Sequence, residues 1–283
     1  MIREFLALTR REFLKIGRNP QAVFTSLLLP LLYLLLFGQG FNVNPTQYVP
    51  SGTSPQVVHG ILVAYFRGAP DYYSYFAAGM VGFVGLSATL FLGANLIFDK
   101  LFGIFKRTRG TPAPSAAVFG SRLVAGAAMP IGLALFVLGL ALLFRHIPGL
   151  SGLEVIAPLD AVGIGEIVLS IVLLTLMFAT LFLTIGILID VPQTYFAAVN
   201  LLNLPVLLTS DALYPWGAMP PWLQSISQYN PVSLTVNVLR ETLFGSAAYP
   251  YPPSVYLLGL VGWSAVLIGI ALTLVRRALR PLA

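Results

Sequence analysis

The chain has 283 residues, of which 57% are apolar and only 9% are charged. Because an average soluble domain carries about 25% charged residues, this composition excludes an ordinary soluble globular protein. The absence of cysteine excludes disulfides and cysteine-based metal sites. The only two histidines, His59 and His146, are too far apart in the sequence to suggest a metal site. The net charge of +6 is therefore interpreted first as membrane topology rather than as nucleic-acid binding.

Long uncharged stretches predict an all-α polytopic membrane protein with six transmembrane helices in one domain, 1–283. Runs of about 20 apolar residues match the hydrocarbon thickness of a bilayer. Pro30 is expected to kink the first span. A cleavable signal peptide is the alternative to a retained first helix, but that run has no clear small-residue cleavage site. The predicted spans are 21–41, 73–98, 118–144, 165–189, 194–214 and 254–275.

The distribution of Lys and Arg orients these spans. Segments on one side of the membrane, 1–20, 99–122, 190–193 and 276–283, hold five, five, none and three cations, or 13 of the 16. The three segments on the opposite side each hold one cation, namely Arg67, Arg145 and Arg240. Cytoplasmic loops carry the positive excess, so both termini are predicted to be cytoplasmic.

The N-terminal segment 1–20 is predicted to be an interfacial amphipathic helix. Apolar residues from Ile2 to Ile16 recur at roughly helical spacing, and arginines occupy the other faces. The alternative is that these cations serve topology alone.

Two external segments interrupt the spans. Segment 42–72 is polar and turn-rich, and is expected to form a loop with a short strand or helix. Segment 215–250 contains an uncharged run long enough to span, but its prolines would leave backbone groups unpaired in lipid. We therefore predict a re-entrant hairpin of two short helices. The first starts at Pro220–Pro221, and the second is capped by Asn230 and ends near Gly245.

The sequence contains no recognisable catalytic motif. It lacks a phosphate-binding loop, an H-E-x-x-H helix and a G-x-S-x-G elbow. The interiors of the predicted spans lack charged residues, which counts against a proton- or sodium-driven carrier. Three asparagines are candidates for a polar pathway, or equally for interhelical hydrogen bonds: Asn95, Asn200 and Asn203.

The cytoplasmic loop 99–117 mixes apolar and basic residues before it reaches Gly110-Thr111-Pro112. A short helix over 100–110 is expected, with one apolar and one basic side. A solvated loop serving topology alone is the alternative, although the run Leu101–Phe105 is too apolar to be left in water. The candidate docking residues are Leu101, Phe102, Ile104, Phe105, Lys106, Arg107 and Arg109.

Several motifs resemble the permease subunits of ABC transporters of the type-2 export class, including the daunorubicin-resistance permeases. The strongest runs from Ser210 to Pro215 and continues through Leu223-Gln224, Tyr229-Asn230-Pro231, Leu239-Arg240 and Gly245. A weaker match in the first cytoplasmic loop comprises Asp99, Gly103, Arg107, Pro112, Gly120 and Arg122, and a third runs from Tyr72-Tyr73 to Gly79. Many relatives carry acidic residues and a "GTL" sequence in that loop, where this chain is basic and has Gly110-Thr111-Pro112.

The resemblance implies six spans, an N-terminal interfacial helix, a coupling helix in 99–117 and an external re-entrant hairpin. It also implies a pair of permeases, homodimeric or heterodimeric, working in the lipid membrane with two separate ATP-binding subunits that hold the ATP and Mg. This chain then carries no cofactor of its own and is not itself an enzyme, and nucleic acid is not expected as a partner. The expected location is a prokaryotic cell membrane. The outer-gate residues are expected to be Tyr214, Pro215, Trp222, Tyr229, Asn230, Pro231 and Arg240.

The expected function is ATP-driven export of a hydrophobic or amphiphilic substrate, such as a drug or a lipid. A stand-alone secondary carrier or channel is the alternative, and transport driven by a proton gradient without an ATPase would establish it. A membrane-embedded enzyme or scaffold is a third class, for which the sequence offers no catalytic cluster.

Overall fold

The computed structural model describes residues 2–18, 20–40, 53–104, 115–245 and 250–278, and every regular element within these ranges is helical. The predicted all-α class is confirmed. The apolar composition leads directly to helices, because only a helix satisfies its own backbone hydrogen bonds within one segment in lipid.

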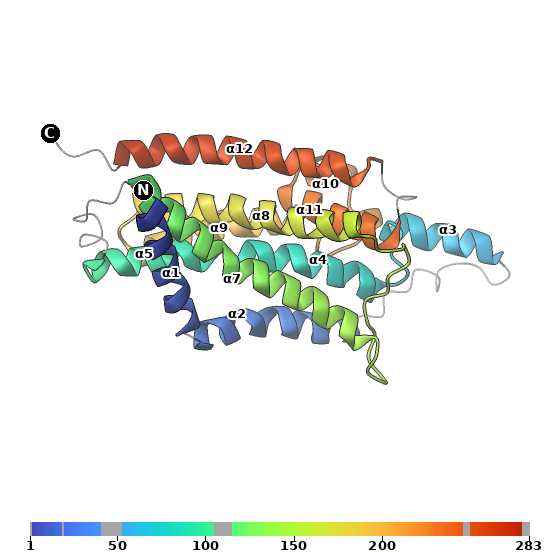
Figure 1. Ribbon diagram of the computed structural model, residues 1–283. Coiled ribbons are helices and arrows are strands. Elements are labelled where there is room, and N and C mark those ends of the chain that lie inside the picture. The colour runs from blue at the N-terminus through green and yellow to red at the C-terminus, as the bar shows by residue number, and fades with distance from the viewer. Residues whose placement is uncertain (1, 19, 41–52, 105–114, 246–249, 279–283) are drawn as a thin grey trace.

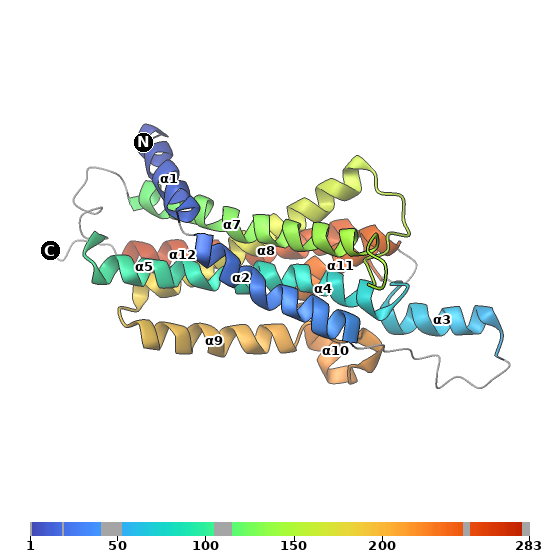
Figure 2. The ribbon, with the colours of Figure 1, turned by 90° about the horizontal axis from the view of Figure 1, so that it is seen from below.

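Most of the helices run along a common direction and form an elongated bundle (Figure 1). α1 runs across this direction near the end of the bundle where both termini lie, and α3 projects beyond the opposite end (Figures 1 and 2). The helices are α1 (Ile2–Gly17), α2 (Pro20–Tyr33), the π-helical η1 (Leu34–Gly38), α3 (Pro55–Phe66), α4 (Tyr72–Ser87), α5 (Leu90–Leu101), α7 (Ser115–Phe144), α8 (Ala161–Leu188), α9 (Pro192–Leu208), the 3-10 turn η3 (Trp216–Ala218), α10 (Pro221–Ser227), α11 (Pro231–Phe244) and α12 (Pro253–Ala278).

Four helical stretches in the described residues are long and apolar enough to cross a membrane. Each coincides with a predicted span: Tyr72–Leu101, Val118–Phe144, Ala161–Leu188 and Pro253–Leu274. The other two predicted spans correspond to shorter helices, the apolar stretch Ser26–Gly38 and the 17-residue α9. Helix length alone therefore supports four crossings.

The span predicted over 194–214 ends earlier in the structure, and the stretch that contains the predicted span 73–98 has an interruption. α9 stops at Leu208, short of 214, because the hydroxyls of Thr209 and Ser210 donate to the carbonyls of Pro205 and Leu207. The stretch from Tyr72 to Leu101 is not one regular helix but two, α4 and α5, which meet at Ala88 and Thr89. In the external segment 42–72, the expected short element is the helix α3, whereas 41–52 lies outside the described residues.

Two helices form the centre of the bundle. All residues of α4 from Tyr73 to Leu86 are buried, and α11 is buried at every position except Thr242. α4 packs against α7, α8 and α11, while α11 also packs against α8 and α12. A helix that is apolar on all sides is expected inside a bundle. α11 is equally buried, although it also contains polar and charged residues.

Glycines permit the closest approaches between helices. A Cβ atom on Gly79 of α4 would overlap the backbone of Ala212, in the irregular segment that follows α9. Gly93 of α5 and Gly186 of α8 similarly lie against each other's backbone, where a Cβ on Gly186 would be 2.8 Å from the Gly93 carbonyl oxygen. These small residues let the backbones pack closely, as in membrane helix pairs generally.

Candidate functional site

A buried group of charged and aromatic residues lies where α4, α11 and the segment after α9 meet. It comprises Asp211, Arg240, Arg67, Tyr75 and Trp216, here called the outer cluster. Asp211 and Arg240 are fully buried, and the Arg240 Nη1 lies 3.1 Å from Asp211 Oδ2. The Arg67 Nη1 lies 3.8 Å from the same oxygen. Two cations thus share one carboxylate inside an apolar bundle.

Backbone carbonyls and an aromatic ring also contact the Arg240 guanidinium. The Arg240 Nη2 donates to the carbonyls of Tyr75 and Asp211 at 2.9 and 3.0 Å. Its guanidinium lies 3.4 Å from the centroid of the Tyr75 ring, a cation–π geometry. The Tyr75 hydroxyl in turn donates to the Asp211 carbonyl at 2.9 Å. Charged groups are tolerated in such surroundings only when they are paired and hydrogen-bonded in this way.

Arg67 connects the outer cluster to helix α3. It follows the last residue of α3 with a positive φ of 47°, and Gly68 continues with φ 83°. Its guanidinium lies 3.6 Å from the Trp216 ring centroid, and its Nη1 donates to Asn237 Oδ1 at 3.2 Å. One side chain therefore holds α3, η3 and α11 together.

Asn230 connects the two arms of the hairpin to α9. Its Oδ1 accepts from the Val232 amide at 2.9 Å, which caps α11, and Pro231 occupies the first helical position. Its Nδ2 donates to the Val206 carbonyl at 2.6 Å and to Thr209 Oγ1 at 3.0 Å, at the end of α9. The predicted cap is confirmed, as are the start of α10 at Pro221 and the end of α11 before Gly245.

The predicted gate residues divide into two groups. Pro215, Asn230, Pro231 and Arg240 are buried, and Tyr214 is half-buried. Trp222 and Tyr229 are largely exposed, at 64% and 68%. Amphipathic aromatic side chains of this kind suit the membrane interface. Most of the predicted gate residues are therefore packed inside the bundle, and only Trp222 and Tyr229 lie at its surface.

Glu241 is a further buried acid on α11, outside the four long spans. Its side chain is 4% exposed, and its Oε2 has no hydrogen-bond partner within the described parts of the chain. Burial, and secondarily the charge of Glu166, raise the pKa of Glu241 to about 7.

The opposite end of the bundle carries a second ionic group, here called the inner cluster: Asp99, Arg122 and Lys15. Asp99 is 3% exposed, and its two carboxylate oxygens lie 2.9 Å from Arg122 Nη2 and 2.9 Å from Lys15 Nζ. These residues come from α5, α7 and α1. The side chain of Arg122 is buried, whereas that of Lys15 is 45% exposed.

Lys100 makes a separate connection from α5 to the end of α8. Its Nζ donates to the carbonyls of Ile187 and Ile189 at 2.7 and 3.0 Å, and lies 2.8 Å from Asp190 Oδ1. The cation thereby satisfies carbonyls that a helix C-terminus leaves free.

The predicted docking residues are only partly described. Lys100 and Leu101 still belong to α5, which Phe102 caps, and Ile104 is helical again. Most of the helix predicted over 100–110 lies outside the described residues. Leu101 and Phe102 are 59% and 74% exposed, and Ile104 is half-buried. The remaining candidates lie outside the described residues: Phe105, Lys106, Arg107 and Arg109.

The three asparagines do not converge on one site. Asn95 on α5 and Asn200 on α9 are exposed on the outside of this bundle, and these two helices pack together. Asn203 is instead buried, at 8% exposure. A polar side chain exposed on an apolar helix needs another polar surface in the membrane.

Sequence reasoning missed Arg67, Tyr75 and Asp211 as members of a site. The charge distribution assigns Arg67 to topology alone, and the family resemblance places Arg240 in the outer gate without naming its partner Asp211. Asp211 offers a usable signal, because it stands alone between the uncharged runs 191–210 and 212–239, and a lone charge at membrane depth requires a partner.

The fold and these clusters define a multi-pass helical membrane protein whose two ends are organised by buried ion pairs. Its sequence matches the ABC-2 type transporter family over residues 3–244, and the chain belongs to this family. It is thus a transmembrane subunit of an ABC transporter, a class that pairs with an ABC ATP-binding subunit.

Named relatives agree with this assignment. The chain is 26% identical to the putative transport permease ycf38 of Porphyra purpurea over 241 residues, covering 85% of this chain and 74% of the relative. It is 26% identical to the protein of the same name from Cyanophora paradoxa, covering 90% and 79%. The daunorubicin resistance ABC transporter permease protein DrrB1 of Streptomyces coeruleorubidus is 24% identical, with coverage of 84% and 83%.

Proposed function

We propose that this chain is the membrane half of an ATP-driven exporter for a hydrophobic or amphiphilic substrate. Two permeases would enclose the pathway, and two separate subunits would bind and hydrolyse ATP with Mg. The complex would reside in a prokaryotic cell membrane with both permease termini in the cytoplasm. The relative that carries a daunorubicin resistance name supports a drug-like substrate class, and the apolar helices are compatible with it.

The observation that carries this proposal is the exposed apolar end of α5 beside the inner cluster. Phe102 is 74% exposed, while Asp99, one turn earlier, is fixed by α7 and α1. A force applied at Phe102 would therefore be transmitted to three helices. Closure of an ATPase dimer needs to favour one of two packings by only about 2–6 kcal/mol to switch access.

The pathway is proposed to lie between two copies, on the face of α5 and α9. Asn95 and Asn200 are exposed on these adjacent helices. In a dimer they would face a polar pathway or a partner permease rather than lipid, which accounts for their exposure. Asn203, being buried, is proposed to serve packing within the subunit.

The hairpin of α10 and α11 is proposed to enter the outer leaflet without crossing and to form the outer gate. Asn230, at its turn, contacts the end of α9, and the Trp263 Nε1 of α12 donates to the Tyr229 carbonyl at 3.0 Å. Because Trp263 lies ten residues inside α12, the turn sits below the outer end of that helix. The four long apolar stretches, together with α2 and α9, would then give six crossings. An even number of crossings keeps the basic C-terminus cytoplasmic, on the same side as the N-terminus.

Docking can be tested by replacing Phe102 with Asp in the complex with the P-loop ATPase encoded beside this chain. We expect the ATPase to dissociate from the purified permease, or its substrate stimulation to disappear. The matched control is Ile156→Asp, which charges an exposed apolar residue in the loop before α8. Undiminished association and stimulation in Phe102→Asp would refute the docking role.

Topology can be tested directly because the chain has no cysteine. Single cysteines at Ser151, at Gln193 and after Ala283 are treated with a membrane-impermeant maleimide. We expect Ser151→Cys to react in intact cells, and the other two only after lysis. Labelling of the C-terminal cysteine in intact cells would show that the hairpin crosses the membrane.

A further inference from the structure

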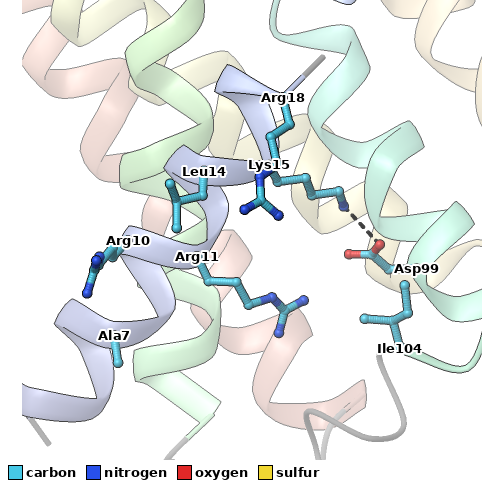
Figure 3. Close-up of a pocket in the computed structure, with 8 residues that line it drawn as sticks. All are labelled: Ala7, Arg10, Arg11, Leu14, Lys15, Arg18, Asp99 and Ile104. Atoms are coloured by element: carbon cyan, nitrogen blue, oxygen red, sulfur yellow. Dashed lines mark hydrogen bonds and ion pairs between the residues drawn. The ribbon is translucent and has the colours of Figure 1, made fainter.

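A basic hollow lies between α1 and the end of α5. It encloses about 520 Å³ and is lined by Ala7, Arg10, Arg11, Leu14, Lys15, Arg18, Asp99 and Ile104. Figure 3 shows Arg11 and Lys15 reaching from α1 toward Asp99 and Ile104, while Arg10 points the other way. Four cations and one carboxylate thus line a single open space.

The carboxylate is already neutralised, so the hollow retains a positive excess. Asp99 is held by Arg122 and Lys15, each at 2.9 Å. Arg11 lies 3.7 Å from Glu12, whose side chain is 15% exposed, so a second acid lies beside the four cations. Arg10 and Arg18 are both exposed. The charge that remains favours an anion, which arginine binds through its planar fork of donors.

Apolar groups beside these cations identify the kind of anion. Leu14 lines the hollow and is 50% exposed, and on the same helix Leu6 and Phe13 are 59% and 46% exposed. α1 also lies across the direction of the spanning helices while it packs along α7 (Figures 1 and 2). An interfacial helix of this kind places its apolar side chains among acyl chains and its cations at the level of the head groups. An acidic protein surface would satisfy the cations but leave Leu6, Phe13 and Leu14 in water.

We infer that this hollow is a binding site for the phosphate head group of an anionic phospholipid. Arg11 and Arg18 would contact the phosphate, and the exposed apolar residues of α1 would lie beside the acyl chains. A lipid bound there would cover the inner cluster, where α1, α5 and α7 are joined. The site is separate from the pathway and from the exposed Phe102, and it does not depend on which substrate is exported.

The test is a lipid titration of the delipidated full-length protein in detergent, followed by native mass spectrometry. The probes are phosphatidylglycerol, phosphatidylcholine and water-soluble glycerol phosphate. We expect one phosphatidylglycerol to bind at least about fivefold more tightly than phosphatidylcholine, since a basic residue near an anionic lipid contributes about that factor. Glycerol phosphate, which lacks acyl chains, is expected to bind much more weakly.

Two pairs of variants locate the site. Arg11→Gln with Arg18→Gln should weaken phosphatidylglycerol binding by about tenfold or more, while Arg11→Lys with Arg18→Lys should retain most of it. Arg276→Gln with Arg277→Gln removes the same charge from a different helix, α12, and should leave binding unchanged. Thermal unfolding of each variant verifies that it remains folded.

Three results would overturn the inference. One is equal affinity for the two lipids, or unchanged binding in the Arg11/Arg18 glutamine variant. Another is glycerol phosphate binding as tightly as the lipid, which would make the hollow a site for soluble phosphate. The third is unchanged lipid binding together with loss of the ATP-binding subunit on purification, which would assign the cations to a protein contact.

Discussion

The outer and inner clusters each place acidic and basic residues at one end of the bundle, but they differ in their access to water. In the outer cluster Asp211 and Arg240 are completely buried, and the Arg240 guanidinium also contacts two backbone carbonyls and the Tyr75 ring. In the inner cluster the Asp99 carboxylate is buried, whereas its partner Lys15 is 45% exposed. A sealed ion pair fixes one arrangement of helices, since separating it strands a charge in an apolar interior. A partly hydrated pair is exchanged at little cost.

This difference suits the two ends to different tasks. The hairpin, α3 and α4 are held as a unit by the outer cluster, so movement at that end should involve the whole unit. At the other end, α1 is joined to α5 by a contact that water and salt weaken. The inner end is therefore the place where a partner or lipid can change helix positions most easily.

The largest expected effect comes from removing Arg240. In Arg240→Met, Asp211 retains only the more distant Arg67, at 3.8 Å, and we expect a loss of about 3–5 kcal/mol in unfolding free energy. Unfolding in detergent micelles, followed by tryptophan fluorescence, measures it. The double variant Asp211→Leu/Arg240→Met should recover much of the loss. A single variant as stable as the parent would mean that the outer cluster does not hold that end together.

A smaller effect is expected where Gly79 meets the Ala212 backbone. Ala at position 79 forces α4 and the segment after α9 apart, which should cost about 1–3 kcal/mol. Gly132→Ala on α7 is the control, because a Cβ there has nothing within 4 Å. The same unfolding measurement applies, and equal stability of the two variants would argue against the close contact.

The inner cluster should respond less to loss of its exposed member. Lys15→Gln leaves Asp99 paired with Arg122, so we expect a loss of no more than about 1 kcal/mol, reduced further by salt. Repeating the unfolding at low and high ionic strength checks this. If Lys15→Gln proved as damaging as Arg240→Met, the contrast between the two clusters would fail.

Glu241 should make the free energy of unfolding depend on pH. Because its pKa is raised from 4.5 to about 7, the folded state binds more protons than the unfolded state between these values. Stability should therefore fall as pH rises through this window. Glu241→Gln should flatten the dependence, as measured by unfolding at pH 5, 6, 7 and 8. Glu154→Gln, at a half-exposed position in the loop before α8, is the matched control.

Local signals were read correctly from the sequence because they act over a few residues. Pro221, Asn230 and Pro231 set the starts of α10 and α11, and their backbone chemistry does not depend on distant segments. The predicted span over 194–214 is longer than α9 because the uncharged run continues past Leu208 to Ser210, whereas hydroxyl–carbonyl bonds of Thr209 and Ser210 end the helix. The outer cluster joins residues more than a hundred positions apart, such as Tyr75 and Arg240, so no local pattern could assemble it.

The two-sided hydrogen bonding of Asn230 has a consequence for kinetics. One amide completes the first turn of α11 with its oxygen and the last turn of α9 with its nitrogen. Displacing the hairpin from α9 would therefore expose two helix ends in a single step. We therefore expect this one residue to contribute to the barrier for such a displacement. Asn230→Ala would be expected to accelerate this motion while leaving both helices in place.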